Sequence, residues 1–210
     1  MDKVLYRNLT KQDYNTIKEI IGDAFGFNNL INDTKFLDIM LNSYLQSCIL
    51  ESSYCKVAEK NNKVIGIILG HADKDNKKIG SLHNKLGFLS SMMKIFVSKK
   101  ENKTLLRDLS KIQDTYNEFI EDKKGDFQGC IHLFIVAKEA RGLGVGKSLL
   151  NQLFNYMNSM EVTSLYLYTD TRCNYGFYDS QNFQRIKEKE VYFDTFNSNL
   201  NIFMYSYNFL

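Results

Sequence analysis

The chain has 210 residues, enough to bury a hydrophobic core without disulfides or metals, so we expect residues 1–210 to form a single domain. Hydrophobic residues make up 44% and charged residues 24%, which excludes a disordered or collagen-like chain. The net charge of +3 is too small to indicate a nucleic acid partner. The apolar runs are too short to cross a bilayer and the first residues carry no export signal, so we expect a cytoplasmic protein without a membrane partner.

The first 72 residues alternate between strand and helix patterns. Thr10 and Asp13 have the spacing of a capping box, which predicts the start of a helix. Asn61 and Asn62 predict a hairpin turn, because Asn tolerates positive φ. In chain order we expect a strand at 4–9, helices at 10–25 and 33–48, and strands at 54–59 and 64–70.

Residues 73–127 have a different pattern. A charged loop is followed by two segments, about 81–99 and 102–123, in which apolar residues recur at helical spacing. Such stripes favour a helical hairpin that packs on a sheet.

From Gly129 onward the pattern returns to alternating strands and helices. The segment 130–137 is apolar except for His132, which is typical of a central strand. No two cysteines have the spacing of a zinc site, so we expect four free thiols (Cys48, Cys55, Cys130, Cys173) and no metal. The expected elements are strands at 130–137, 164–169, 183–193 and 200–207, and helices at 144–160 and 175–181.

The strongest signal is the glycine-rich turn between the strand that ends near Val136 and the next helix. Glycines at 142, 144 and 146 permit positive φ and a close approach of the backbone to a ligand. The first N–H groups of the helix that follows are unpaired and carry a partial positive charge. Such a turn is suited to hold a phosphate or a diphosphate.

Two nucleotide-binding patterns fit this turn less well. Gly146-Lys147-Ser148 ends like a Walker A loop, but that loop requires Gly at position 141, where Arg stands. A dinucleotide fold requires Gly-x-Gly-x-x-Gly, whereas the spacing here is Gly-x-Gly-x-Gly. A nucleoside triphosphatase is therefore a less favoured alternative.

The turn instead resembles the signature of the GNAT superfamily of acyl-CoA-dependent N-acetyltransferases. Phe134-Ile-Val136 and then Arg141 to Gly146 match its hydrophobic strand and its Arg-Gly-x-Gly-hydrophobic-Gly turn, although Lys138 replaces the usual loop proline. Asn174 to Phe183 resembles the later motif Asn-x-x-x-Tyr-x-x-x-Gly-Phe of that family, with Asn182 in place of Gly. The resemblance spans about 129–185, extends more weakly over 4–72, and is absent from 73–127.

The resemblance implies an α/β fold of the GNAT type, a mixed, mostly antiparallel sheet of about seven strands flanked by helices. The central fourth and fifth strands would splay apart, and the helical insertion at about 73–127 would lie between strands 3 and 4. The implied reaction moves an acetyl group from acetyl-CoA to a primary amine by direct attack in a ternary complex. The implied cofactor-binding residues are Phe134, Ile135, Val136, Arg141, Gly142, Leu143, Gly144, Val145, Gly146, Lys147 and Asn174.

The resemblance also assigns two roles in the chemistry. Tyr178 matches the general acid that protonates the departing CoA thiolate. A backbone N–H near Val136 would polarise the thioester carbonyl as negative charge develops on its oxygen. A route through an acetylated Cys130 or Cys173 is disfavoured, since the sequence places no base for either thiol.

Three residues are candidates for the base that deprotonates the amine. His132 comes first, because it shares a strand face with Phe134 and Val136 and its imidazole suits proton relay near neutral pH. Glu59 and then His71 are the alternatives.

The acceptor is a small-molecule or protein amine, and a homodimer is compatible with the sequence. The insertion leaves from a strand that edges the amine site, so it could also wall or cover that site, with Met92 and Met93 as an adaptable lining. The alternative function is an acyl-CoA-binding regulatory module without turnover, because the same turn would serve both.

Overall fold

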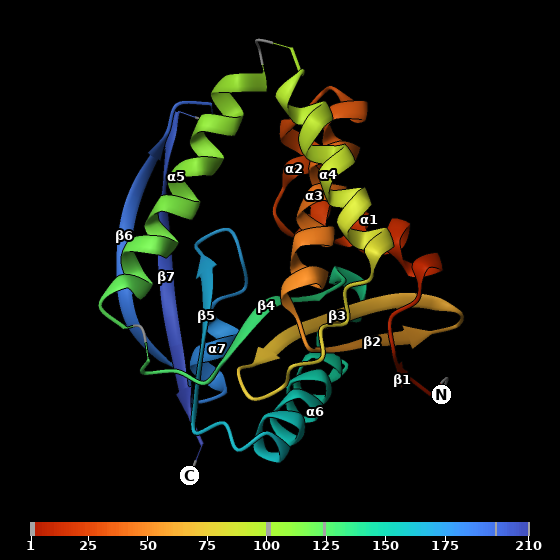
Figure 1. Cartoon of the computed structure of the whole chain (residues 1–210), viewed down its shortest axis with the longest axis vertical. Coiled ribbons are helices and arrows are strands. Elements are labelled where there is room, and N and C mark those ends of the chain that lie inside the picture. The colour runs from red at the N-terminus through yellow and green to blue at the C-terminus, as the bar shows by residue number, and fades with distance from the viewer. Residues whose placement is uncertain (1–2, 100–101, 124, 196, 210) are drawn as a thin grey trace.

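The structure is a computed structural model that describes residues 3–99, 102–123, 125–195 and 197–209. Its strands form a seven-stranded sheet in the order β1-β2-β3-β4-β5-β7-β6. β4 and β5 are parallel, and every other neighbouring pair in this order is antiparallel. The expected mixed, mostly antiparallel sheet is therefore confirmed, with helices on both of its faces (Figure 1).

The expected elements form close to their predicted positions. The strands are β1 (Leu5–Arg7), β2 (Tyr54–Lys60), β3 (Lys63–Ala72), β4 (Gly129–Val136), β5 (Ser164–Asp170), β6 (Gln184–Phe193) and β7 (Ser198–Asn208). The helices are α1 (Tyr14–Ala24), α2 (Phe27–Leu30), α3 (Thr34–Glu51), α4 (Leu82–Phe96), α5 (Asn102–Glu121), α6 (Val145–Ser159) and α7 (Gly176–Ser180). The sequence did not predict α2, which begins after Gly26 turns the chain with a φ of 72°.

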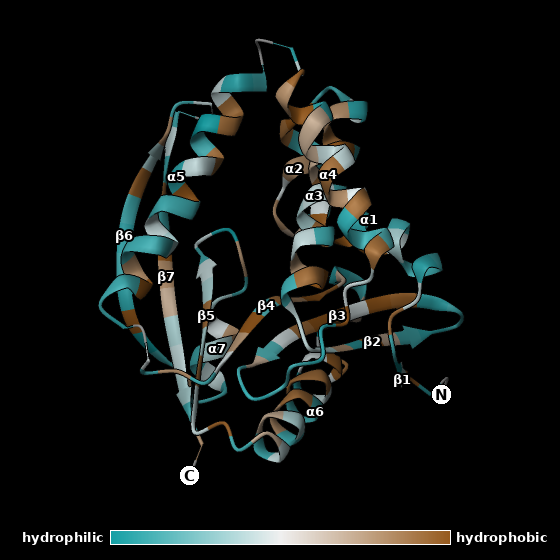
Figure 2. Cartoon of the chain, viewed as in Figure 1, coloured by the Kyte–Doolittle hydropathy of each residue, from teal (hydrophilic) through white to brown (hydrophobic). Residues whose placement is uncertain are grey.

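Helices cover the two faces of the central strands. Leu45 of α3 packs in the same buried cluster as Ile67 of β3, whereas Leu149 of α6 packs with Ile68 of β3. Successive residues of a strand point to opposite faces, so neighbouring positions of β3 serve the two layers. Figure 2 shows β3 and β4 as largely hydrophobic, as expected for strands buried on both sides.

Helix α4 packs against α3 rather than against the sheet. Its two buried residues make polar contacts: Asn84 Nδ2 donates to Gln46 Oε1 at 2.8 Å, and Asn42 Nδ2 donates to Ser91 Oγ at 2.9 Å. The prediction that both helices of the insertion pack on the sheet is therefore wrong for α4, because the polar groups that this helix buries are hydrogen-bonded to α3.

Helix α5 does pack on the sheet, along β6 and β7 (Figure 1). Phe119 of α5 lies in a buried cluster with Ile202 and Met204 of β7. Near the other end of the helix, the buried carboxylate of Asp108 accepts a hydrogen bond from Thr195 N at 2.7 Å. None of the helices formed by the described residues combines the length and the apolar character needed to cross a bilayer.

The two parallel strands separate after a short contact. β4 pairs with β5 only over 129–131 and 165–167, and the remaining residues of both strands diverge. The predicted splay of the fourth and fifth strands is therefore confirmed, and it opens the sheet at its centre.

Candidate active site

A cavity of about 320 Å³ occupies the opening between β4 and β5. Its walls come from the end of β4, the glycine-rich turn, the first turn of α6, and α7. The structure thus brings together ten of the eleven residues predicted to bind a cofactor: Phe134, Ile135, Val136, Arg141, Gly142, Gly144, Val145, Gly146, Lys147 and Asn174. Leu143 is the exception, since its side chain is 55% exposed and does not line the cavity.

The turn is shaped by two glycines with positive φ. Gly142 has a φ of 79° and Gly144 a φ of 74°, and a Cβ at either position would meet no atom within 4 Å. Gly144 is the N-cap of α6, and the first helical bond runs from Ser148 N to Gly144 O at 3.0 Å. The three N–H groups of residues 145–147 precede that bond and are available to an anion in the space over the turn.

The last residues of β4 direct backbone groups into the same cavity. Ala137 N donates to Ile65 O of β3 at 2.9 Å, so this N–H points away from the opening. Because N–H directions alternate along an antiparallel strand, the N–H groups of Val136 and Phe134 point toward β5. At that level β5 has already diverged from β4, which leaves these donors facing the cavity.

Tyr178 lies in α7 on the far wall of the cavity and is only 8% exposed. Its ring packs edge-on against Phe134 at 6.3 Å and Phe183 at 5.5 Å between centroids. Burial raises the pKa of its phenol well above the usual range, so Tyr178 carries its proton at neutral pH. Asn174 O accepts a hydrogen bond from Phe177 N at 3.1 Å, which holds the start of this helix.

His132 sits in a β-bulge of β4. Leu69 of β3 pairs with Leu133 and Gly70 pairs with Ile131, so His132 is the extra residue between them. Its Nδ1 lies 3.6 Å from Glu51 Oε2, and its Nε2 lies 3.3 Å from Cys130 Sγ. Burial lowers the pKa of His132 to about 4, so the imidazole is neutral at physiological pH.

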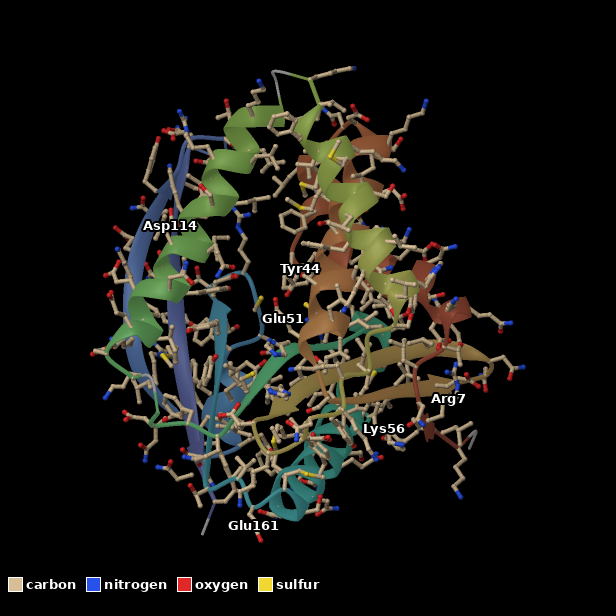
Figure 3. The ribbon with its side chains drawn as sticks, viewed as in Figure 1. Arg7, Tyr44, Glu51, Lys56, Asp114 and Glu161 are labelled. Atoms are coloured by element: carbon tan, nitrogen blue, oxygen red, sulfur yellow. The ribbon has the colours of Figure 1, made fainter. Side chains whose placement is uncertain are left out.

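His132 also borders a second cavity, of about 480 Å³, on the side of the insertion. Glu51 of α3 lines this space, and Figure 3 shows it below Tyr44, a residue of the same helix that lines the first cavity. Burial raises the pKa of the Glu51 carboxyl. The other lining residues are Leu50, His71, Asp73, Lys78, Ile120, Lys123, Gly125, Phe127, Gly129, Cys130 and Tyr166.

The third candidate base, His71, lies at the end of β3 in this second cavity. Its Nδ1 is 3.0 Å from Ser53 Oγ and 3.2 Å from Lys78 Nζ. Burial and the charge of Lys78 lower the pKa of His71. His71 lines the second cavity without reaching the first, unlike His132.

Glu59 is placed away from both cavities, and its interpretation as a base is wrong. It lies on β2, where its Oε2 accepts hydrogen bonds from Arg7 Nε at 2.8 Å and Arg7 Nη2 at 2.5 Å. Arg7 also donates to Asp13 Oδ1 at 2.7 Å. Glu59 therefore ties β1 to β2 and to the start of the first helix, and it is not free to accept a proton from a substrate.

The four cysteines are free thiols, as predicted. Burial raises the pKa of the Cys130 and Cys173 thiols to about 12, so neither is a thiolate at neutral pH. This disfavours an acetyl-cysteine intermediate. Within the part of the chain that the structure describes, no group of three or more His, Cys, Asp or Glu side chains is arranged to hold a metal ion.

The sequence interpretation missed Glu51 and the aromatic walls of the first cavity. Phe25, Tyr44 and Tyr168 line that cavity, and Glu51 touches His132. Tyr44, Cys48 and Glu51 recur at i, i+4 and i+7, so they share one face of α3. This spacing could have indicated that Tyr44 and Glu51 lie on one face of the helix. It could not indicate which other element that face contacts.

Comparisons with known proteins agree with this arrangement. Residues 111–183 match the profile of the Acetyltransferase (GNAT) family. A ribosomal-protein-alanine N-acetyltransferase from Brucella melitensis aligns over 98% of this chain and 99% of its own, at 16% identity and a TM-score of 0.53. An N-acetyltransferase from Staphylococcus aureus Mu50 aligns over 98% of both chains, at 16% identity and a TM-score of 0.55.

A third solved structure with this architecture is the ribosomal-protein-S18-alanine N-acetyltransferase from Escherichia coli. It aligns over 98% of this chain and 94% of its own, at 11% identity and a TM-score of 0.54. At these identities the likeness is evidence for the fold alone. A search of curated protein sequences found no match.

Proposed function

We propose that the chain is an acetyltransferase of the GNAT superfamily, whose profile residues 111–183 match, and that it moves an acetyl group from acetyl-CoA to a primary amine by direct attack in a ternary complex. The observation that carries this proposal is the opening between β4 and β5. One cavity there joins the glycine-rich turn, the free amides of β4, Tyr178 and His132. Residues 1–210 would then act as one acetyltransferase domain, with the insertion at about 73–127 as part of it.

The glycine-rich turn is the proposed site for the diphosphate of acetyl-CoA. The amides of residues 145–147 have no helical acceptor, and the open space over Gly142 and Gly144 gives an anion access to them. The N-terminal end of the α6 dipole favours negative charge at the same point. Arg141 and Lys147, which line the cavity, add positive charge.

The end of β4 is the proposed site for the thioester. The N–H groups of Val136 and Phe134 would donate to the carbonyl oxygen as the amine adds and negative charge develops there. The tetrahedral intermediate then collapses with cleavage of the carbon–sulfur bond. Tyr178, which burial keeps protonated, donates its proton to the thiolate that leaves.

We assign the base to His132. Its neutral imidazole can take the proton that the attacking amine loses, and Glu51 at 3.6 Å balances the positive charge that forms. In this scheme Glu51 is a positioning residue, since it acts through His132. The position of His132 between the two cavities supports entry of the amine from the second cavity, whose walls include Ile120 and Phe127 of the insertion.

A regulatory module that binds acyl-CoA without turnover is the remaining alternative from a different functional class. The nucleoside triphosphatase is less well supported, because a P-loop domain is built on a parallel sheet and only β4 and β5 are parallel here.

Two measurements test the proposal. A thermal-shift comparison should show stabilisation by acetyl-CoA and none by ATP, since the protein should bind only the first. Release of free CoA thiol should then depend on an amine when a panel of polyamines, amino sugars, arylalkylamines and peptide N-termini is screened. Binding of acetyl-CoA without amine-dependent thiol release from any member would favour the regulatory module, and stabilisation by ATP would favour the triphosphatase.

A further inference from the structure

Helix α4 exposes its apolar face to solvent. Eight of the fourteen large apolar side chains that are exposed in the described residues lie within 79–97. Leu82 is 72% exposed, Leu86 and Leu89 are each 59% exposed, Met93 is 67% exposed and Phe96 is 84% exposed. These five residues are spaced 4, 3, 4 and 3 apart, so they form one continuous stripe along four turns of the helix.

The most buried residues of α4, on the face opposite the stripe, are polar. Asn84 is 3% exposed and Ser91 is 4% exposed, and both make hydrogen bonds to side chains of α3. Asn84 Nδ2 also lies 2.8 Å from Tyr14 Oη of α1. These contacts fix the rotation of the helix about its axis, so the apolar stripe cannot turn inward without breaking them. An exposed stripe of this size, held outward by specific bonds, indicates a contact surface.

The segment that carries the stripe has charged residues of one sign, although Lys99 Nζ at its end lies 4.0 Å from Asp33 Oδ2, the N-cap residue of α3. Between Asp75 and Glu101 the sequence contains no Asp or Glu, while the described part of that segment holds five lysines: Lys77, Lys78, Lys85, Lys94 and Lys99. At 100° per residue, Lys85 and Lys94 lie on opposite sides of the stripe. Long lysine side chains in these positions can extend past apolar contacts toward anionic groups.

We propose that α4 docks on an anionic lipid surface, with its stripe among the acyl chains and its lysines at the headgroups. A helix with an apolar face flanked by lysine has the composition of an interfacial helix, which lies in the membrane plane and needs no spanning length. A second copy of the chain would instead bring two sets of lysines together without an acidic partner on either helix. The sequence led us to expect no membrane partner because only spanning segments were considered.

This docking surface is independent of the acetyl-transfer proposal. Neither cavity is lined by a residue of the stripe, so changes there should leave acetyl-CoA binding intact. The two proposals can therefore fail separately.

Co-sedimentation with vesicles tests the docking surface. The full chain should sediment with vesicles of equal parts phosphatidylcholine and phosphatidylglycerol, and remain in solution with phosphatidylcholine alone. Leu89→Glu combined with Met93→Glu should abolish sedimentation by placing charge in the stripe. Lys85→Gln combined with Lys94→Gln should lower the partition coefficient by roughly tenfold, since each lysine near an anionic surface adds to the attraction.

The control is Leu5→Glu, which adds one of the two negative charges of that double variant at a side chain 55% exposed on β1, outside the stripe. It should sediment like the unmodified chain, and all variants should keep the circular dichroism spectrum and the acetyl-CoA thermal shift of the parent. Absence of sedimentation, or sedimentation unchanged by the Leu89 and Met93 substitutions, would overturn the proposal. It would also be overturned if light scattering shows a dimer that the same double variant converts to a monomer, because a second copy would then cover the stripe.

Discussion

Helices α4 and α6 have the same length, 15 residues each, and both are amphipathic. The apolar side of α6 is buried, whereas the apolar side of α4 is exposed to solvent. α6 buries Leu149 and Leu153 completely under the sheet, whereas α4 exposes Leu86 and Leu89 and buries amide and hydroxyl groups. The orientation of α6 follows from the core that it completes. The orientation of α4 is set by polar bonds to α3. Ile95 packs on a buried cluster that contains Phe36 and Leu105, but the apolar stripe itself faces solvent. The same type of sequence pattern can therefore serve the fold in one helix and an external contact in another.

A substitution in the turn that precedes α6 should have the largest effect, a loss of affinity for acetyl-CoA. Gly144→Glu places a carboxylate where the diphosphate is proposed to bind and adds a Cβ at a φ of 74°. We expect the affinity for acetyl-CoA to fall by roughly 100-fold or more, measured by isothermal titration calorimetry. Gly26→Glu is the control, because Gly26 has a φ of 72° and open space but does not line the cavity. Equal affinity in the Gly144 variant and the parent would refute the diphosphate assignment.

Replacement of Tyr178 by Phe should affect turnover and leave binding alone. The phenol is the proposed proton donor, and removal of a general acid typically lowers a rate by about 10²-fold or more. The ring itself packs against Phe134 and Phe183, and Phe keeps those contacts. We expect kcat to drop while the dissociation constant for acetyl-CoA stays within a factor of about two. A variant with normal kcat would remove Tyr178 from the mechanism.

The contrast between α6 and α4 can be measured as the change in unfolding free energy when a leucine of each helix is replaced. Leu149→Ala removes a fully buried side chain from under the sheet and should cost about 2–4 kcal/mol of unfolding free energy. Leu89→Ala removes a side chain that is 59% exposed and should change the same quantity by less than about 0.5 kcal/mol. Urea denaturation followed by circular dichroism gives both values. A large loss from Leu89→Ala would mean that the α4 stripe is covered within the chain itself.

The pH dependence of stability should report the burial of His132. Its pKa is about 4 in the folded chain and about 6.5 when unfolded, so the unfolded state binds more protons between these values. The contribution of the neutral imidazole is therefore complete above pH 6.5 and is lost as the pH falls toward 4. Between pH 7 and pH 5 we expect a loss of roughly 1–2 kcal/mol that His132→Gln largely removes. An equal loss in parent and variant would show that other groups control it.

Much of the fold and of the lining of the first cavity could be predicted, because their signals are local. Continuous apolar runs identify β3 and β4, and three closely spaced glycines before a helix identify the turn at residues 142–146. Tyr178 was found through the spacing of its motif. Each of these signals depends on residues that are near one another in the chain.

The remaining errors concern contacts between distant segments. Glu59 was considered as a base because strand spacing cannot reveal that Arg7, 52 positions earlier, pairs with it. Glu51 was overlooked because its partnership with His132 arises only when α3 crosses β4. The rotation of α4 depends on hydrogen bonds from Asn42 and to Gln46, and apolar spacing alone favoured the opposite face.

The short pairing between β4 and β5 has a consequence for the resistance of the protein to proteolysis. Only three residue pairs join the half of the sheet that contains β1 to β4 to the half that contains β5 to β7. A ligand lodged in the opening contacts both halves and binds only when they are correctly placed, so it resists their separation. A ligand bound there should therefore slow proteolysis of transiently opened chains, which limited proteolysis with and without acetyl-CoA would measure.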